Sequence, residues 1–275
     1  MTLALATPRA TLPDLRRMAS DAPAFTALAI LLFLGLVPLY AAMALDTRIF
    51  QGESPWMKPV KFHYALGVYT LSLAFFARFM PAATRQGRPW RWFTAAVTFA
   101  FVGEVVWLSG AALLNTASHF NTTVPFLAAI YQLMGVFAVL LTSASLVMGI
   151  SVWRNRGIGL APALHLSVAL GLILTFALTI PVAGYLSASG GHFVGTSTRE
   201  LWIMGWSRDA GDLRVAHFLA THALHFIPLA GLVAAWAIPA QATRAVWLAA
   251  VLFAALVAFA FLQALQGRPF LPFLG

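Results

Sequence analysis

Two long stretches without a charged side chain constrain the fold more than any other feature of the sequence. Residues 105–153 hold no Asp, Glu, Lys or Arg, and residues 157–198 hold none either. Both stretches are rich in Leu, Ala, Val and Phe. About 20 consecutive apolar residues are enough for one helical crossing of a bilayer. Each stretch therefore predicts helices that lie in lipid.

The composition of the whole chain excludes several classes of protein. Of the 275 residues, 61% are hydrophobic and only 9% are charged, whereas a soluble domain carries about 25% charged residues. The chain has no Cys, which excludes thiolate metal sites and disulfide-stapled modules. The net charge of +9 does not indicate nucleic-acid binding, because the arginines lie in short segments between apolar runs. We expect an integral membrane protein with the lipid bilayer as its main partner and no nucleic acid.

Apolar runs and the breaker residues between them predict an all-α, polytopic transmembrane helix bundle. The boundaries of these runs are set by local signals. Some runs begin with a proline, and others are separated by Gly-Arg-Pro, Asn-Arg-Gly or Gly-Gly. Residues 24–265 form one seven-helix membrane domain, between an N-terminal segment, 1–23, and a C-terminal tail, 266–275. The predicted spans are 24–45, 60–81, 90–114, 124–150, 160–188, 213–237 and 244–265. Asp212 is expected to cap the sixth span, and Pro228 to kink it.

The basic residues predict the orientation of the bundle. If the N-terminus is cytoplasmic, ten arginines lie on the inside, against seven Lys and Arg residues outside. Five acidic residues also lie outside and partly neutralise the bases there. Because cytoplasmic loops carry the excess of positive charge, we expect a cytoplasmic N-terminus and an external C-terminus.

Six of the seven histidines lie in the outer half of the predicted bundle, and only His165 lies near the inner side. The outer group consists of His63, His119, His192, His217, His222 and His225. Imidazole binds metals and haem iron, and it also titrates near neutral pH. This one-sided distribution is the strongest functional signal in the sequence.

Glu104 is the single carboxylate in the middle of a predicted span. An ionised carboxylate in lipid costs several kcal/mol, so Glu104 is expected to face the interior of the bundle. Its predicted depth matches that of His225 on the sixth span. We therefore expect a contact between Glu104 and His225.

Four segments of the sequence carry a resemblance when they are taken together. They are Trp-Met-Lys-Pro-Val-Lys-Phe at 56–62, Ser-His-Phe-Asn at 118–121, Gly-His-Phe-Val-Gly at 191–195 and Gly-Asp-Leu-Arg-Val-Ala-His-Phe at 211–218. The combination resembles a group of uncharacterised bacterial integral membrane proteins, over most of the chain between residues 55 and 230. The resemblance implies a multi-pass protein of the bacterial inner (cytoplasmic) membrane, and it implies no activity.

The leading hypothesis from the sequence is an outward-facing transition-metal site. His119, His192, His217 and His222 are the predicted ligands, and the scarcity of carboxylates favours Zn, Cu or Fe over harder cations. Glu104 and Asp212 are the candidate acid–base groups of a metal-dependent membrane oxidoreductase or hydrolase. The substrate would be a lipophilic or periplasmic small molecule, and the glycine-rich loop 189–212 would act as a lid.

Two alternatives stay open at this point. One is a haem-b electron carrier linked to quinone, with axial ligands drawn from His63, His217, His222 and His225. The other is a proton-coupled transporter or sensor in which Glu104 and His225 relay protons. Arg214 is a candidate for binding the anionic group of a cofactor or lipid, and a salt bridge to Asp212 or Asp209 is its alternative role.

Overall fold

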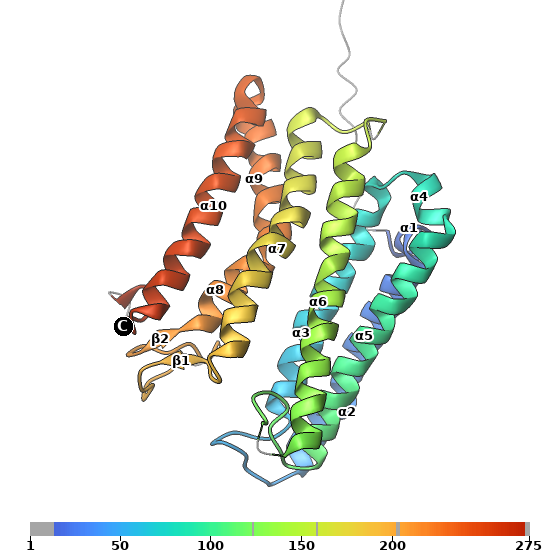
Figure 1. Cartoon of the computed structure of the whole chain (residues 1–275). Coiled ribbons are helices and arrows are strands. Elements are labelled where there is room, and N and C mark those ends of the chain that lie inside the picture. Colours follow the sequence, from blue (N-terminus) through green and yellow to red (C-terminus); the bar gives the residue numbers. More distant parts are fainter. Residues whose placement is uncertain (1–13, 123, 158, 202–203, 273–275) are drawn as a thin grey trace, which may run out of the picture.

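Long helices running side by side make up most of the molecule, with a two-stranded sheet near one end (Figure 1). The structure, a computed structural model, describes residues 14–122, 124–157, 159–201 and 204–272. In this described part, six helices are long and apolar enough to cross a membrane, and a bent pair of helices adds a seventh candidate span if its two parts are taken as one. The prediction of an all-α bundle with apolar helices of membrane-spanning length is confirmed.

The helix boundaries lie close to the predicted ones. The six long helices are α2 (Pro23–Leu45), α3 (Met57–Phe76), α5 (Arg88–Leu113), α6 (Pro125–Arg154), α7 (Pro162–Ala188) and α10 (Ala242–Leu265). A proline lies in the first turn of α2, α5, α6 and α7, where its missing N–H costs nothing. The 3₁₀ helices η1 (Ala77–Phe79) and η2 (Pro239–Gln241) adjoin the end of α3 and the start of α10.

Both terminal segments extend beyond the described residues. Residues 1–13 of the predicted N-terminal segment and residues 273–275 of the tail lie outside them. The rest of the N-terminal segment contains the short helix α1 (Leu15–Asp21), which Asp14 caps and whose Met18 is buried in the core. A second short helix, α4 (Ala82–Gln86), precedes α5. These two short helices and the start of α5 define what we call the arginine end of the bundle.

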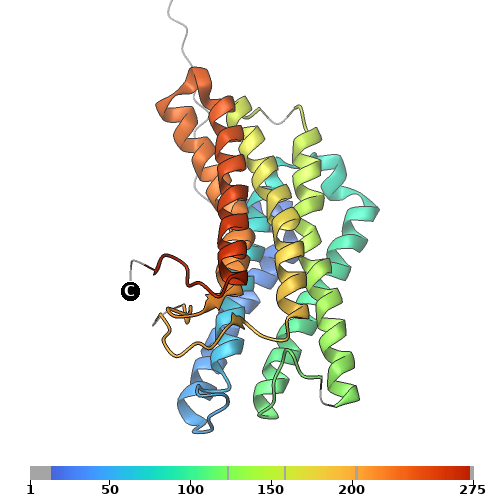
Figure 2. The same ribbon diagram turned by 60° about the vertical axis from the view of Figure 1, so that its left-hand side comes forward.

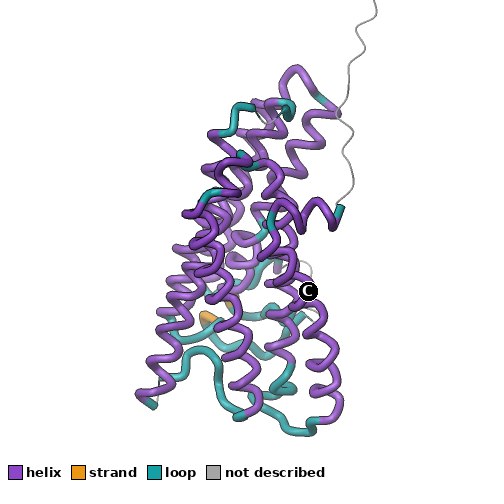
Figure 3. Tube along the Cα trace, turned by 90° about the vertical axis from the view of Figure 1, so that its right-hand side faces the viewer, coloured by secondary structure: helices purple, strands orange, loops and turns teal. Residues whose placement is uncertain are grey.

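The bundle consists of two groups of helices joined through α6. Helices α2, α3 and α5 pack together, and α7, α9 and α10 pack together, while α6 contacts both α5 and α7. Figures 2 and 3 show this arrangement from two further directions. The main core lies where the groups meet, and Phe25, Leu73, Phe101, Met148 and Leu172 are fully buried there.

Apolar side chains also cover much of the outer surface of the helices. Trp236 is 84% exposed and Val37 is 70% exposed, and many Leu and Val residues of α2, α9 and α10 are similarly open. A water-soluble monomer rarely exposes contiguous apolar surface of this extent. The exposed faces therefore fit a lipid bilayer as the surrounding medium.

The sixth predicted span is not a single helix, which corrects the sequence analysis. It consists of α8 (Leu213–Thr221) and α9 (Ala223–Ala237), which meet at His222 with a bend of 53°. The main bend thus lies six residues before Pro228, the residue at which the sequence predicts a kink. At the break, the amide of Leu224 donates to Thr175 Oγ1 of α7 at 2.9 Å instead of to the preceding turn. A side chain of a neighbouring helix thus replaces a helical hydrogen bond.

Replacing Thr175 with Val should destabilise the break. Thr175 is 1% exposed, and Val keeps its shape while removing the acceptor for the Leu224 amide. Leaving that buried donor unpaired is expected to lower the free energy of unfolding by about 1–3 kcal/mol. Unfolding in mixed detergent micelles measures the difference.

Thr179 supplies a matched control for this substitution. It lies one turn further along α7, is 3% exposed, and its Oγ1 has no hydrogen-bond partner among the described residues. Thr179→Val should therefore cost less than Thr175→Val. Equal losses for the two variants would contradict the role assigned to Thr175.

Candidate functional site

Titratable side chains from six segments gather toward one end of the bundle, opposite the arginine end. This histidine end contains the start of α3, the loop between α5 and α6, and the loop between α7 and α8 (Figure 1). Two local contacts fix its loops. Trp56, which precedes α3, donates from Nε1 to Asp46 at 2.8 Å, and Trp107 of α5 donates to the carbonyl of Ser118 at 2.9 Å.

Glu104 lies on α5 and is only 4% exposed, as predicted for an intramembrane carboxylate. Its Oε2 is buried and has no hydrogen-bond partner among the described residues. The charged group close enough to interact with it electrostatically is Lys58, at the start of α3. Lys58 also interacts with Glu53, which is exposed in the loop before α3. Glu104 is thus a buried group with one cationic neighbour and an unused acceptor.

His119 lies in the loop after α5 among aromatic rings. Its ring centroid is 5.6 Å from that of Phe62 and 6.0 Å from that of Tyr131. Ser118 Oγ and His119 Nδ1 are hydrogen-bonded at 3.1 Å. Burial, aided by the positive charge of Lys58 and by His192, lowers the pKa of His119 to about 3. The imidazole is therefore neutral at physiological pH.

His192 lies across Phe120 from His119. The ring centroids of His192 and Phe120 are 5.2 Å apart, and the His192 carbonyl accepts from the Leu213 amide at 3.0 Å. Burial lowers the pKa of His192 to about 4, with smaller contributions from the charges of Arg214 and Lys58. Its Nδ1 is buried without a hydrogen-bond partner among the described residues.

Three histidines follow the broken span in order. His217 lies on α8 close enough to interact electrostatically with both His192 and His222. The His222 ring stacks on Phe218 with centroids 4.0 Å apart and lies 5.4 Å from the His225 ring. His225 Nε2 is hydrogen-bonded to Ser72 Oγ of α3 at 2.8 Å. The Nδ1 atoms of His217 and His225 are both buried without a partner in the described part of the chain.

Electrostatic interactions between neighbouring titratable groups place Glu104 and His225 at the two ends of one series. The order is Glu104, Lys58, His192, His217, His222 and His225, with His119 beside Lys58 and His192. The direct contact expected between Glu104 and His225 is not formed, since His225 Nε2 bonds Ser72 and Nδ1 has no partner among the described residues. We call this series the titratable chain.

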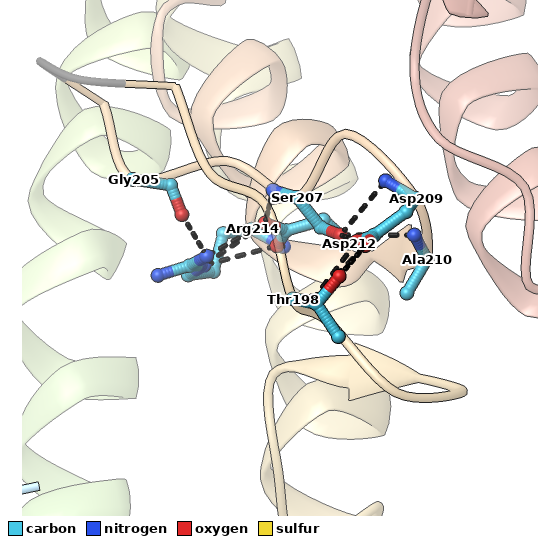
Figure 4. Close-up of polar contacts among 7 residues, drawn as sticks. All are labelled: Thr198, Gly205, Ser207, Asp209, Ala210, Asp212 and Arg214. Carbon is cyan, nitrogen blue, oxygen red and sulfur yellow. Dashed lines mark hydrogen bonds and ion pairs between the residues drawn. The ribbon is translucent and has the colours of Figure 1, made fainter.

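Asp212 and Arg214 form a closed ion pair rather than an open site (Figure 4). Asp212 is 1% exposed, and its carboxylate accepts from Arg214 Nε at 2.9 Å and from Nη2 at 2.7 Å. It also accepts from the amides of Arg214 and Ser207, both at 2.9 Å. Arg214 donates further to the carbonyl of Gly205. The predicted N-cap at Asp212 is confirmed, and Arg214 takes its alternative role as the salt-bridge partner of Asp212.

The loop predicted to be a lid is fastened to the body of the protein. Its ends pair as the antiparallel strands β1 (Phe193–Val194) and β2 (Gly211–Asp212). A Cβ on Gly211 would collide with the backbone of Ala264 at the end of α10, so the strand packs directly against that helix. Arg208 donates to the carbonyls of Phe270 and Leu271 at 3.1 and 3.2 Å. These contacts favour a fixed cover over a mobile lid.

His63 lies apart from the titratable chain. It is 8% exposed on α3, its Nδ1 is 2.9 Å from the carbonyl oxygen of Pro59, and a Cβ on Gly35 of α2 would come within 3.0–3.2 Å of its ring. The ring of His63 therefore packs against α2 at Gly35. His165 Nε2 is hydrogen-bonded to the carbonyl oxygen of Val152 at 2.6 Å. His165 is not a member of the titratable chain.

The predicted metal ligands do not converge on one point. Among the described residues, no group of three or more His, Asp or Glu side chains is arranged to hold a metal ion. His119, His192, His217 and His222 are strung along the titratable chain instead. Asp212, proposed as an acid–base group, has its carboxylate occupied by Arg214 and backbone amides.

Two members of the site were not predicted from the sequence. Lys58 is one of two lysines in the chain and lies in the segment 56–62, just before a predicted span. Ser72 carries no sequence signal, because a lone Ser in an apolar helix is common. Only the packing of α3 near α9 shows that it meets His225.

The low pKa values of the two loop histidines predict acid sensitivity. His119 and His192 stay neutral in the folded protein down to about pH 3 and 4, whereas an unperturbed histidine titrates at 6.5. The unfolded state therefore binds more protons between these values, and stability falls as the pH drops below 6.5. Each histidine contributes a loss of at most about 1.4 kcal/mol per pH unit in that window.

A denaturation series between pH 7.5 and 4 measures this loss. Replacing both histidines with Gln should flatten the dependence, since Gln does not titrate. A slope that is unchanged in the double variant would contradict the assignment of these two groups.

Comparison of the chain with protein-family models, with curated proteins and with solved structures finds no match. The resemblance of its motifs to bacterial integral membrane proteins therefore stays a prediction. The function has to be argued from the geometry of the site.

Proposed function

We propose that this chain is a proton-translocating membrane protein that uses the titratable chain as a relay. The observation that carries the proposal is the broken span at His222. It places three histidines around the break, two of which have a buried and unpartnered Nδ1. A buried polar atom without a partner is costly, and such atoms persist where a proton or ligand is handled.

The chemistry of the series suits proton transfer. Neutral imidazole has one protonated and one free nitrogen, so it accepts a proton on one side and releases another on the opposite side. Ionisable residues inside a membrane bundle typically mark a proton or ion pathway. Glu104, with an unused acceptor and Lys58 beside it, is the acidic member of the relay. His225 is its other end.

The break in the span supplies the movement that complete translocation needs. The titratable chain runs from the histidine end and stops at His225, in the first turn of α9. Discontinuous helices in transporters place the handling site at the break and allow one part of the bundle to move against another. In our proposal, α9 tilts about His222 and exposes His225 alternately to the two sides of the membrane.

Replacing His225 with Gln should slow proton movement. The variant keeps a hydrogen-bonding group opposite Ser72 but cannot carry a proton at neutral pH. We expect the rate of proton uptake into proteoliposomes to fall at least about tenfold, equivalent to about 1.4 kcal/mol in the barrier. A pH-sensitive dye trapped inside the vesicles gives the rate.

His165→Gln is the matched control. His165 is also hydrogen-bonded within the bundle, but to the carbonyl of Val152 and outside the titratable chain. This variant should retain the wild-type rate. Equal rates in His225→Gln and wild-type protein would refute the role of His225.

A further inference from the structure

A cavity of about 390 Å³ opens at the arginine end, away from the titratable chain. It lies between the turn that joins α1 to α2, the short helix α4, and the first two turns of α5. The polar groups that line it include Ser20, Asp21, Arg85, Gln86, Arg91 and Thr94. Phe25 and Trp90 form an apolar wall, with ring centroids 6.1 Å apart.

The charge around this cavity is positive. Asp21 forms ion pairs with Arg85 and, at 3.5 Å, with Arg17. Arg91 also lines the cavity, is exposed, and forms no ion pair among the described residues. The lining itself holds two guanidinium groups, those of Arg85 and Arg91, against the carboxylate of Asp21, which leaves a net charge of +1.

Arg85 presents an unused donor at this site. Its side chain is 16% exposed and is held in place by Asp21. Its Nε is buried and has no hydrogen-bond partner in the described part of the chain. Such donors match the oxygens of a phosphate group.

The position of the cavity favours a lipid over a soluble anion. It lies where α2 and α5, both of membrane-spanning length, begin at Pro23 and Arg88. Headgroups of the bilayer lie at this level of a spanning helix. Trp90, which is typical of the membrane interface, lies against this cavity at the start of α5.

We propose that this cavity binds the phosphate of an anionic phospholipid headgroup, with Arg85 and Arg91 as the phosphate ligands. The site is independent of the titratable chain. It would anchor α1, α4 and the start of α5 to the leaflet at the arginine end.

Native mass spectrometry of the purified full-length chain tests this site. The protein is incubated in detergent with phosphatidylglycerol or with phosphatidylcholine, and the retained lipid is counted. We expect phosphatidylglycerol to be retained preferentially, and Arg91→Gln to reduce its retention about fivefold, the effect of one interfacial arginine. Arg91 is exposed and has no ion-pair partner among the described residues, so the fold should survive the change.

Arg88→Gln provides the matched control, because Arg88 is exposed on the same helix but does not line the cavity. It should retain phosphatidylglycerol as the wild type does. Equal retention of both lipids, or equal losses in the two variants, would overturn the proposal. Displacement of the lipid by millimolar inorganic phosphate would also overturn it, since the site would then bind the free anion.

Discussion

Asp212→Asn is expected to lower the free energy of unfolding by about 1.5–3 kcal/mol, because the buried carboxylate loses charge-assisted hydrogen bonds while the Arg214 side chain is 27% exposed. Asp212 is 1% exposed and accepts from the guanidinium of Arg214 and from two backbone amides. Asn keeps the volume but loses the charge, and its NH₂ group cannot accept. The positive charge of Arg214 would then lie beside β2 without a negatively charged partner.

The effect should extend to the whole loop between α7 and α8. Asp212 caps α8 and accepts a hydrogen bond from the amide of Ser207. Loss of its carboxylate should therefore weaken the contacts of both the start of α8 and the loop. Unfolding in mixed micelles gives the free energy, and hydrogen exchange locates the change. Glu200→Gln, on an exposed side chain of the same loop, should stay within about 0.5 kcal/mol of the wild type. A similarly small effect of Asp212→Asn would contradict the structural role of the ion pair.

Glu104→Gln is expected to reduce proton uptake into proteoliposomes about a hundredfold, a typical contribution of one acid–base group. Gln is isosteric with Glu, and Oε2 of Glu104 has no hydrogen-bond partner among the described residues. The substitution therefore removes the titratable proton without disturbing a described contact at that atom. Stability should be unchanged or higher, because a buried carboxylate is costly in lipid.

Glu53→Gln separates this effect from a general change of charge. Glu53 is exposed near the histidine end and lies 3.5 Å from Lys61 in an ion pair. Both carboxylates also interact with Lys58, but only Glu104 is buried. Glu53→Gln should keep the wild-type rate of proton uptake. If Glu104→Gln keeps it too, Glu104 is not part of a relay.

The helices of this chain were predictable because each boundary has a local cause. A proline starts α2, α5, α6 and α7 close to the predicted positions, and Asp212 caps α8 as expected. The break at His222 was not predictable. It depends on the hydroxyl of Thr175, which lies 49 residues away in sequence from the amide that it accepts.

The site was predictable as a list of residues but not as an arrangement. Glu104 and the histidines at 119, 192, 217, 222 and 225 do gather toward one end of the bundle. The sequence predicts one span over residues 213–237, whereas the 53° bend at His222 divides its three histidines between two helices and the break. The salt bridge between Asp212 and Arg214 is the alternative role that the sequence leaves open for Arg214.

Proton uptake by the wild-type chain is the most direct test of the proposed relay. Proteoliposomes that contain a pH-sensitive dye and potassium are diluted into sodium buffer, and valinomycin then makes the interior negative. The proposal predicts that the interior acidifies faster than in empty vesicles of the same lipid, at a rate proportional to the protein content. An acidification rate equal to that of empty vesicles, with the protein shown to be folded and inserted, would contradict it.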